Sequence, residues 1–185
     1  MINLVSIIFI FMKKITLFLF LVSFVSCSAQ KEATFKTKKF SNEELIFQYP
    51  KTWHRFGGNG YVFLKPKLIY EYGIEDGNHL LVNKSYIEVK ENDSILQIID
   101  NYARILKRHE VDKSFKIIKL GVESNFNYKV EYSIKYSFSD LIFKREEYFK
   151  KVNSHLKFAS YQMQEDLFDQ YLFEAKFIIN SIEYK

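Results

Sequence analysis

The spacing of apolar and polar residues predicts a series of short strands. The most regular pattern runs from Phe126 to Phe138, where every second residue is aromatic or branched and the residues between are polar. Such alternation is typical of a strand with one buried and one solvated face. We therefore expect Phe126 and Tyr128 to share the buried face with the later aromatic residues of this strand.

A second strand, Leu45 to Tyr49, ends at Pro50 and is followed by Trp53, the only tryptophan. Proline has no amide hydrogen, so the chain leaves the sheet there, and Trp53 is expected to pack in the core beyond this corner. Glycines in 57–60 predict a hairpin turn. Segment 67–78 is interpreted as a surface excursion with a strand-like middle. Further strands are predicted in 38–42, 61–64, 80–82, 86–89, 115–122, 141–152 and 155–163.

Two helices are expected. Ser94 and Gln97 form a Ser-x-x-Gln capping box, and Glu165 and Asp166 open the last helix near its positive end. The apolar face of the first helix is expected to contain Ile95, Ile98, Ile99, Tyr102, Ile105, Leu106 and His109. The stripe of the last helix is expected to contain Phe168, Tyr171, Leu172, Ala175, Ile178, Ile179 and Ile182. The pattern favours an α+β fold, a twisted antiparallel sheet covered by helices.

The N-terminal residues 1–26 have the order of a secretory signal. Lys13 and Lys14 are their only charges, and an apolar run from Ile15 to Val25 follows. That run is too short to span a bilayer, which needs roughly 20 residues. Met12 is interpreted as the true start, although an extended signal or a membrane anchor that begins at Met1 is an alternative.

Cys27 is the only cysteine, so no internal disulfide can form. The segment Phe24 to Cys27 resembles the lipobox of bacterial lipoproteins, which implies that Cys27 is lipidated after cleavage. The resemblance further implies export across the inner membrane and anchoring in the outer membrane, on its periplasmic or surface leaflet. Residues 27–39 would then be a flexible tether, and 40–185 a single domain.

Charge gives little support for nucleic acid as a partner. Without residues 1–26 the formal charge falls from +5 to +3, and both signs are interspersed. The content of aromatic residues is high, with 19 Phe and 13 Tyr, which favours one well-packed domain.

The order of these elements resembles the PsbP-like family. The resemblance rests on the corner from Phe47 to Trp53, the helix that begins at Ser94, the strand with Gly121, the meander after it, and the closing segment Phe177 to Ile182. It implies an α/β/α sandwich around an antiparallel sheet. It also implies a binding or assembly role, with no shared catalytic residues.

Candidate site residues are few. The histidines show no spacing typical of metal ligands. His54 and His79 could approach one another if both loops leave the same sheet edge, so Trp53, His54 and His79 are weak ligand-site candidates; the alternative is packing in the core or in loops. Glu146 and Glu147 are expected on opposite faces of one strand, which argues against paired carboxylates. No catalytic, cofactor or metal site is predicted.

Three functions remain open. The first is a membrane-tethered, non-enzymatic protein of the cell envelope with a binding or assembly role and a protein partner. The second is a lipid or small-ligand carrier in which aromatic residues line a cavity. The third is an enzyme with dispersed active-site residues, although no convergent titratable groups are visible in the sequence.

Overall fold

A computed structural model describes residues 35–58, 60–71, 77–83, 87–109, 115–122, 124–136 and 140–185, which all belong to one compact unit, Phe35–Lys185. The predicted signal peptide, Cys27 and the first part of the predicted tether lie outside the described residues. The described backbone includes Phe35 to Lys39, ahead of the predicted start of the domain at Phe40.

The strands form two antiparallel sheets. The smaller has the order β1-β2-β11, with β1 (Thr37–Ser41), β2 (Leu45–Pro50) and β11 (Glu183–Tyr184). The larger has the order β3-β4-β5-β10-β9-β8-β7. Its bounds are β3 (Trp53–Gly58), β4 (Tyr61–Pro66), β5 (His79–Asn83), β7 (Lys116–Lys119), β8 (Tyr128–Lys135), β9 (Ile142–Val152) and β10 (His155–Gln164), and β6 (Ile87–Glu88) pairs with β10.

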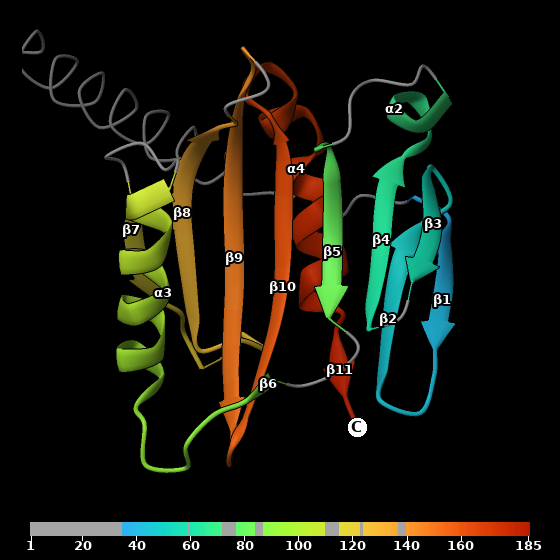
Figure 1. Cartoon of the computed structure of the whole chain (residues 1–185). Helices are drawn as coiled ribbons and strands as arrows, with labels where there is room; N and C mark the ends of the chain where they lie inside the picture. The colour runs from blue at the N-terminus through green and yellow to red at the C-terminus, as the bar shows by residue number, and fades with distance from the viewer. Residues whose placement is uncertain are drawn as a thin grey trace, which may run out of the picture. The chain divides into compact units, whose positions relative to one another are not determined.

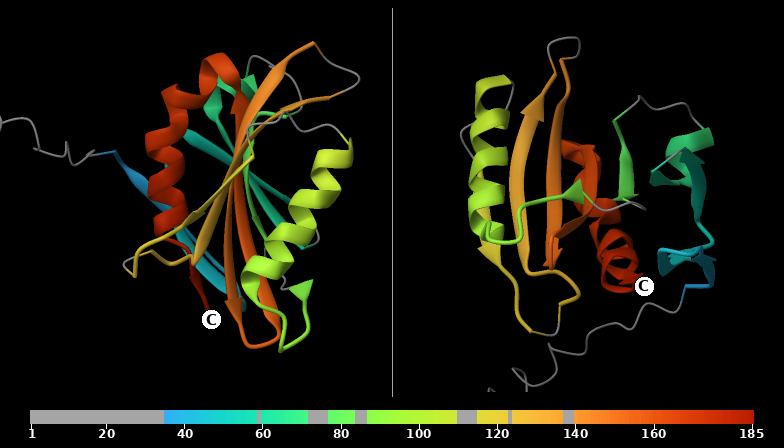
Figure 2. Two further views of the ribbon diagram at one scale, coloured as in Figure 1. Left: turned by 90° about the vertical axis from the view of Figure 1, so that its left-hand side faces the viewer. Right: turned by 60° about the horizontal axis from the view of Figure 1, so that its bottom comes forward.

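Helices α3 (Ile95–His109) and α4 (Glu165–Asn180) lie on opposite sides of the larger sheet (Figure 2, left). This layering confirms the α+β fold and the α/β/α arrangement. We call the side with α3, which faces the viewer in Figure 1, the front of the sheet, and the side with α4 the rear. Within the described residues, no helix combines the length and the apolar composition needed to cross a membrane.

Strand alternation divides the interior into two cores. On the rear, α4 buries Phe168, Ala175, Ile178 and Ile179 against the large and small sheets. On the front, Ile99 of α3 packs in a second cluster with Val130, Tyr132, Ile134, Phe143, Phe149 and Leu156. Strands β9 and β10 thus supply both cores with alternate residues, as the period of two requires.

The predicted corner is confirmed. Strand β2 ends at Pro50, and after Lys51 and Thr52 the chain enters β3, which belongs to the other sheet. Trp53 is 1% exposed in the rear core, and its indole Nε1 donates a hydrogen bond to the Glu174 carboxylate of α4.

The expectation of a strand-like middle in 67–78 is wrong, because Lys67–Glu71 is a short helix, α2. Pro66 ends β4, and the Lys67 amide donates to the Thr52 carbonyl at 2.8 Å, so the chain turns back over β3. One turn then buries Ile69, at 2% exposure, while its neighbour Tyr70 is 51% exposed.

Two expected core positions are also wrong. Phe126 precedes β8 and packs in the rear core against Tyr148, with ring centroids 5.7 Å apart, whereas Tyr128 faces the front. The strand begins only at Tyr128, so its alternation does not extend back to Phe126. Ile105 is 58% exposed, and Ala103, at 6%, contributes to the buried face of α3 in its place.

Candidate functional site

The front of the large sheet is covered unevenly. Figure 1 shows α3 in front of β7 and β8, whereas no described helix other than the short α2 lies over β3, β4 and β5. Side chains on this second part therefore meet solvent: Tyr61 of β4 is 39% exposed, and Tyr70 of α2 beside it is 51% exposed. The part of the front that β3, β4 and β5 form is called the open front below.

Aromatic rings cover the open front. Phe56 of β3 and Phe63 of β4 are paired in register, and their rings are nearly parallel, with centroids 5.6 Å apart. Tyr61 lies beside Phe63 at 6.3 Å. On the other side, His54 stacks on Tyr70 of α2 at 4.2 Å. Rings in contact stabilise one another beyond the area they bury, so these residues form a continuous aromatic surface.

A polar row crosses the sheet beside these rings. His54 pairs with Lys65, His79 pairs with Gln162, and Gln162 pairs with Arg145. Lys65 and His79 are the next residues in the β4–β5 register, so all five residues lie on the front, on five consecutive strands. The row begins on the open front and continues under α3.

A groove of about 400 Å³ lies where the rings meet this row. Ligand sites typically have volumes of about 300–1,000 Å³, with apolar walls and a few polar groups. We call it the aromatic groove; its lining residues are Phe56, Phe63, Lys65, Gly77, His79, Tyr136 and Gln162.

Gln162 in this lining is buried, with 1% of its surface exposed. Its Oε1 accepts hydrogen bonds from the Tyr136 hydroxyl at 3.0 Å and from Arg145 Nη1 at 3.3 Å. Its Nε2 donates to the Gly77 carbonyl at 2.9 Å. Three contacts to separate segments fix both the position and the orientation of this amide.

Arg145 connects the groove to a buried ion pair under α3. Its Nη2 lies 2.7 Å from Glu147 Oε1, and Glu147 also accepts a hydrogen bond from the Tyr102 hydroxyl of α3 at 2.9 Å. Burial raises the pKa of the Glu147 carboxyl, against the opposing attraction of the Arg145 guanidinium. Burial, followed by the charge of Glu147, raises the pKa of the Tyr102 hydroxyl. Perturbed titratable groups next to a groove are typical of functional sites.

The structure separates the residues that the sequence nominated. Trp53 faces the rear core, whereas His54, the next residue, faces the front. His54 and His79 do share the front, but they lie two strands apart with Lys65 between them, so their Cα atoms are about 10 Å from each other. The described residues contain no group of three or more potential metal ligands. A joint ligand role of the two histidines stays a prediction that a metal titration tests.

Sequence reasoning missed Gln162 and Arg145. Gln162 alternates with apolar neighbours, as a residue of a solvated strand face does, and Arg145 stands in a run of charged residues, so no local signal marks either as buried. The expected separation of Glu146 from Glu147 is confirmed: Glu146 accepts a hydrogen bond from Lys129 on the rear, and Glu147 binds Arg145 on the front.

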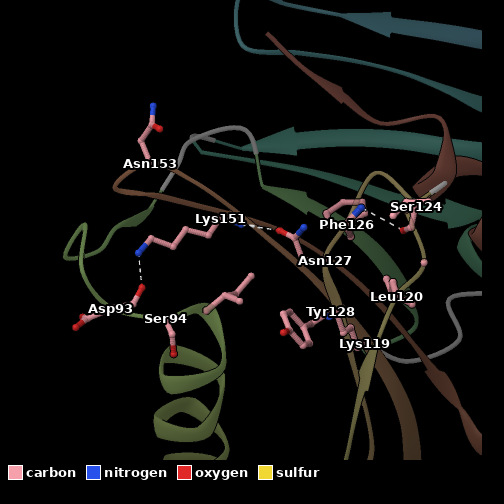
Figure 3. Close-up of a pocket in the computed structure, with 13 residues that line it drawn as sticks. Asp93, Ser94, Lys119, Leu120, Ser124, Phe126, Asn127, Tyr128, Lys151 and Asn153 are labelled. Carbon is pink, nitrogen blue, oxygen red and sulfur yellow. Dashed lines mark hydrogen bonds between the residues drawn. The ribbon is translucent and has the colours of Figure 1, made fainter.

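A larger hollow, about 680 Å³, lies where α3 begins, beside the β9–β10 turn (Figure 3). Lys151 crosses it, and its Nζ donates to the carbonyls of Lys90 at 3.0 Å and Glu91 at 2.8 Å, and to that of Asp93. Its amide donates to Asn127 Oδ1 at 3.3 Å. These contacts hold the segment before α3 in place, so this hollow is the weaker candidate.

Comparison with known proteins identifies the fold. No family profile and no curated protein matches the chain. Among solved structures, the solution structure of cyanobacterial PsbP (CyanoP) from Synechocystis sp. PCC 6803 matches with a TM-score of 0.54 at 13% identity, over 85% of this chain and 98% of that one. A crystal structure from Bacteroides thetaiotaomicron VPI-5482 matches with a TM-score of 0.49 at 13% identity, over 80% of this chain and 48% of that one. The first of these matches shows that the chain has the PsbP-like fold that the order of its elements implied.

Proposed function

We propose that this protein is a lipid-anchored, non-enzymatic binding protein of the cell envelope, and that the aromatic groove is its binding site. Cys27 would hold the protein at the outer membrane, and the domain would present the open front to a partner. The observation that carries the binding role is the uncovered aromatic surface on β3 and β4, next to a polar row that is ordered by buried hydrogen bonds.

Exposed aromatic rings cost the protein stability, and a binding role explains why they are exposed. Clustered aromatic side chains that remain in contact with solvent forgo the stabilisation of burial, roughly 25 cal/mol per Å², and they favour association with another surface. Aromatic residues are also the side chains that contribute most to the centre of recognition sites. The PsbP-like fold is compatible with such a role.

The anchor is tested by replacing Cys27 with Ala. We expect wild type to incorporate a labelled fatty acid and to sediment with membranes, and Cys27→Ala to do neither. Two acyl chains suffice for stable anchoring, so partial release of wild type by a salt wash would contradict the lipid anchor.

The groove is tested by photo-crosslinking in cells. A benzophenone amino acid at Phe63 is expected to capture a partner. The same group at Phe173, which is 56% exposed on α4, is the matched control and should capture none. Equal adducts at both positions, or adducts at neither, would count against the groove as the binding site.

The volume of the groove also favours a second candidate, a carrier of a small ligand. About 400 Å³ accommodates one small organic molecule, without requiring an enclosed cavity. Native mass spectrometry of the protein released gently from membranes distinguishes the two functions, because a carrier retains a bound mass and a partner-binding protein does not.

A further inference from the structure

The hydrogen bonds of Gln162 determine which of its atoms remains available to a ligand. Its Oε1 already accepts from Tyr136 and Arg145, and one Nε2 hydrogen is used by the Gly77 carbonyl. An amide nitrogen carries two hydrogens, so one Nε2 hydrogen has no partner among these contacts. The Gln162 amide, which lines the groove, therefore has a donor left for a ligand and no free acceptor.

The Arg145–Glu147 ion pair keeps this donor in place. Arg145 is an obligate donor, so the atom of Gln162 that faces it must be the oxygen. A flip of the amide would set Nε2 against the guanidinium and against the Tyr136 hydroxyl hydrogen. Arg145 is itself held by Glu147 at 2.7 Å, so the buried pair acts on the groove as a positioning element.

Two further side chains of the groove, Lys65 and His79, can also donate hydrogen bonds. Lys65 brings an ammonium group, whose Nζ lies 5.8 Å from the centre of the Phe56 ring, and His79 brings an imidazole beside Phe63. Among the described residues that line the groove there is no carboxylate. Donors and positive charge thus lie beside flat apolar walls.

We propose that the aromatic groove binds an organic carboxylate with a flat apolar body. The ring of the ligand would pack against Phe56 and Phe63, and its carboxylate would accept hydrogen bonds from Lys65 and from Gln162 Nε2. Such charge-assisted bonds are about twice as strong as neutral ones. This inference deepens the binding function proposed above and rests on it. The carboxylate could belong to a free acid or to the C-terminal residue of a partner.

Three probes with the same carbon skeleton test whether the groove prefers a negatively charged ligand. They are 3-phenylpropionate, 3-phenylpropionamide and 3-phenylpropylamine, titrated by ligand-detected NMR against the protein as cells produce it, reconstituted in nanodiscs, with empty nanodiscs as the blank. We expect the acid to bind about tenfold more tightly than the amide and the amine to bind least. N-acetylphenylalanine separates the sources, since a site for a C-terminal residue binds it more tightly than 3-phenylpropionate.

Matched variants locate the effect. Lys65→Met is expected to reduce the preference of acid over amide by about tenfold, whereas Lys116→Met, which removes the same charge at the far edge of the sheet, should leave it unchanged. Gln162→Glu removes the donor while keeping the shape, and should reverse the preference towards the amine. Lys65→Met carries the test if Gln162→Glu does not fold.

Two results would overturn the inference. One is equal affinity for acid and amide in wild type. The other is an acid preference that survives Lys65→Met unchanged. Either result combined with a crosslink at Phe63 leaves the binding function standing and removes only the ligand class, whereas the absence of the crosslink removes the proposed function itself.

Discussion

Two areas of the large sheet are covered by neither α3 nor α4, and their side chains differ. The open front carries the rings of Phe56, Phe63 and Tyr61. The rear of β7 and β8, which α4 does not cover in Figure 1, carries charged side chains, among them Lys129, Glu131 and Lys135. Its ion pairs are Lys129–Glu131 at 2.5 Å and Lys135–Asp140 at 3.3 Å, and Lys129 also lies 3.0 Å from Glu146, which is buried on β9.

The charged residues of the rear are suited to contact with water, whereas the aromatic residues of the open front are suited to recognition. The exposed pair Lys135–Asp140 keeps its charges hydrated, and such a pair contributes about 0–1 kcal/mol. Aromatic residues on an uncovered strand gain nothing comparable from water. Where one sheet has both kinds of uncovered area, the aromatic area is the one whose composition is not explained by solubility. The contrast can be tested by the following changes, beginning with the largest expected effect.

Charges on the two faces are expected to differ most in their effect on stability. Arg145→Met leaves Glu147, at 1% exposure, without its partner, and should lower the free energy of unfolding by about 3–5 kcal/mol. Lys135→Met removes a rear charge whose side chain is 57% exposed and should cost less than about 1 kcal/mol. Denaturant unfolding followed by the fluorescence of Trp53, the only tryptophan, measures both.

The double variant Arg145→Met with Glu147→Met is the control for that result. Removing both charges takes away the uncompensated carboxylate, so a large part of the lost stability should return. If Arg145→Met alone costs less than about 1 kcal/mol, the pair is solvated and the contrast between the faces fails.

The aromatic surface is expected to affect binding more than folding. Phe63→Ser removes the ring contact with Phe56 and should lower stability by about 1 kcal/mol, because both rings are only half-buried. Loss of a ring at the centre of a binding site should reduce partner recovery by at least about tenfold. Pull-down and denaturant unfolding of the same preparation measure the two effects.

The matched variant on the rear face is Ser133→Ala on β8, which should change neither stability nor recovery. Partner recovery that is equal in Phe63→Ser and wild type would show that exposure of aromatic rings on the open front serves no recognition.

Much of the fold could be predicted because its signals are local. The corner at Pro50, the capping serine and the alternation in β8 each depend on neighbours within a few residues; the Gln97 amide does donate to Ser94 Oγ at 3.1 Å. The short helix α2 was missed because a single turn has no periodicity, and its conformation depends on the contact of Lys67 with Thr52.

The groove could not be predicted because it depends on strand order. Phe56 and Gln162 are far apart in sequence and come together only because β5 pairs with β10. Ser160 and Gln162 alternate with Tyr161 just as solvated residues would, yet they are 0% and 1% exposed. Their burial comes from residues of other segments, such as Tyr136 and Arg145, which hydrogen-bond to them, and it is not encoded within β10 itself.

The smallest expected effect concerns the pH dependence of stability, and the two faces should differ in its sign. On the rear, burial opposes the shift, but the hydrogen bond from Lys129 and its charge hold the pKa of Glu131 below the usual 4.5. The folded state therefore binds the proton less readily than the unfolded state. The stabilisation is present above pH 4.5 and is lost as the pH falls through the folded pKa.

Glu131→Gln should flatten the acid side of the stability curve by less than about 1 kcal/mol, because the side chain is 34% exposed and solvent screens the pair. Glu147 has a raised pKa, so its folded form holds the proton more readily, and its contribution falls as the pH rises above the unfolded value of 4.5. Glu147→Gln should therefore remove the loss of folding stability that Glu147 causes as the pH rises towards neutral. Unfolding curves between about pH 3 and 8 measure both slopes. Equal slopes in the two variants would mean that water reaches both carboxylates alike, and the Arg145–Glu147 pair could then not hold the Gln162 amide of the groove in one orientation.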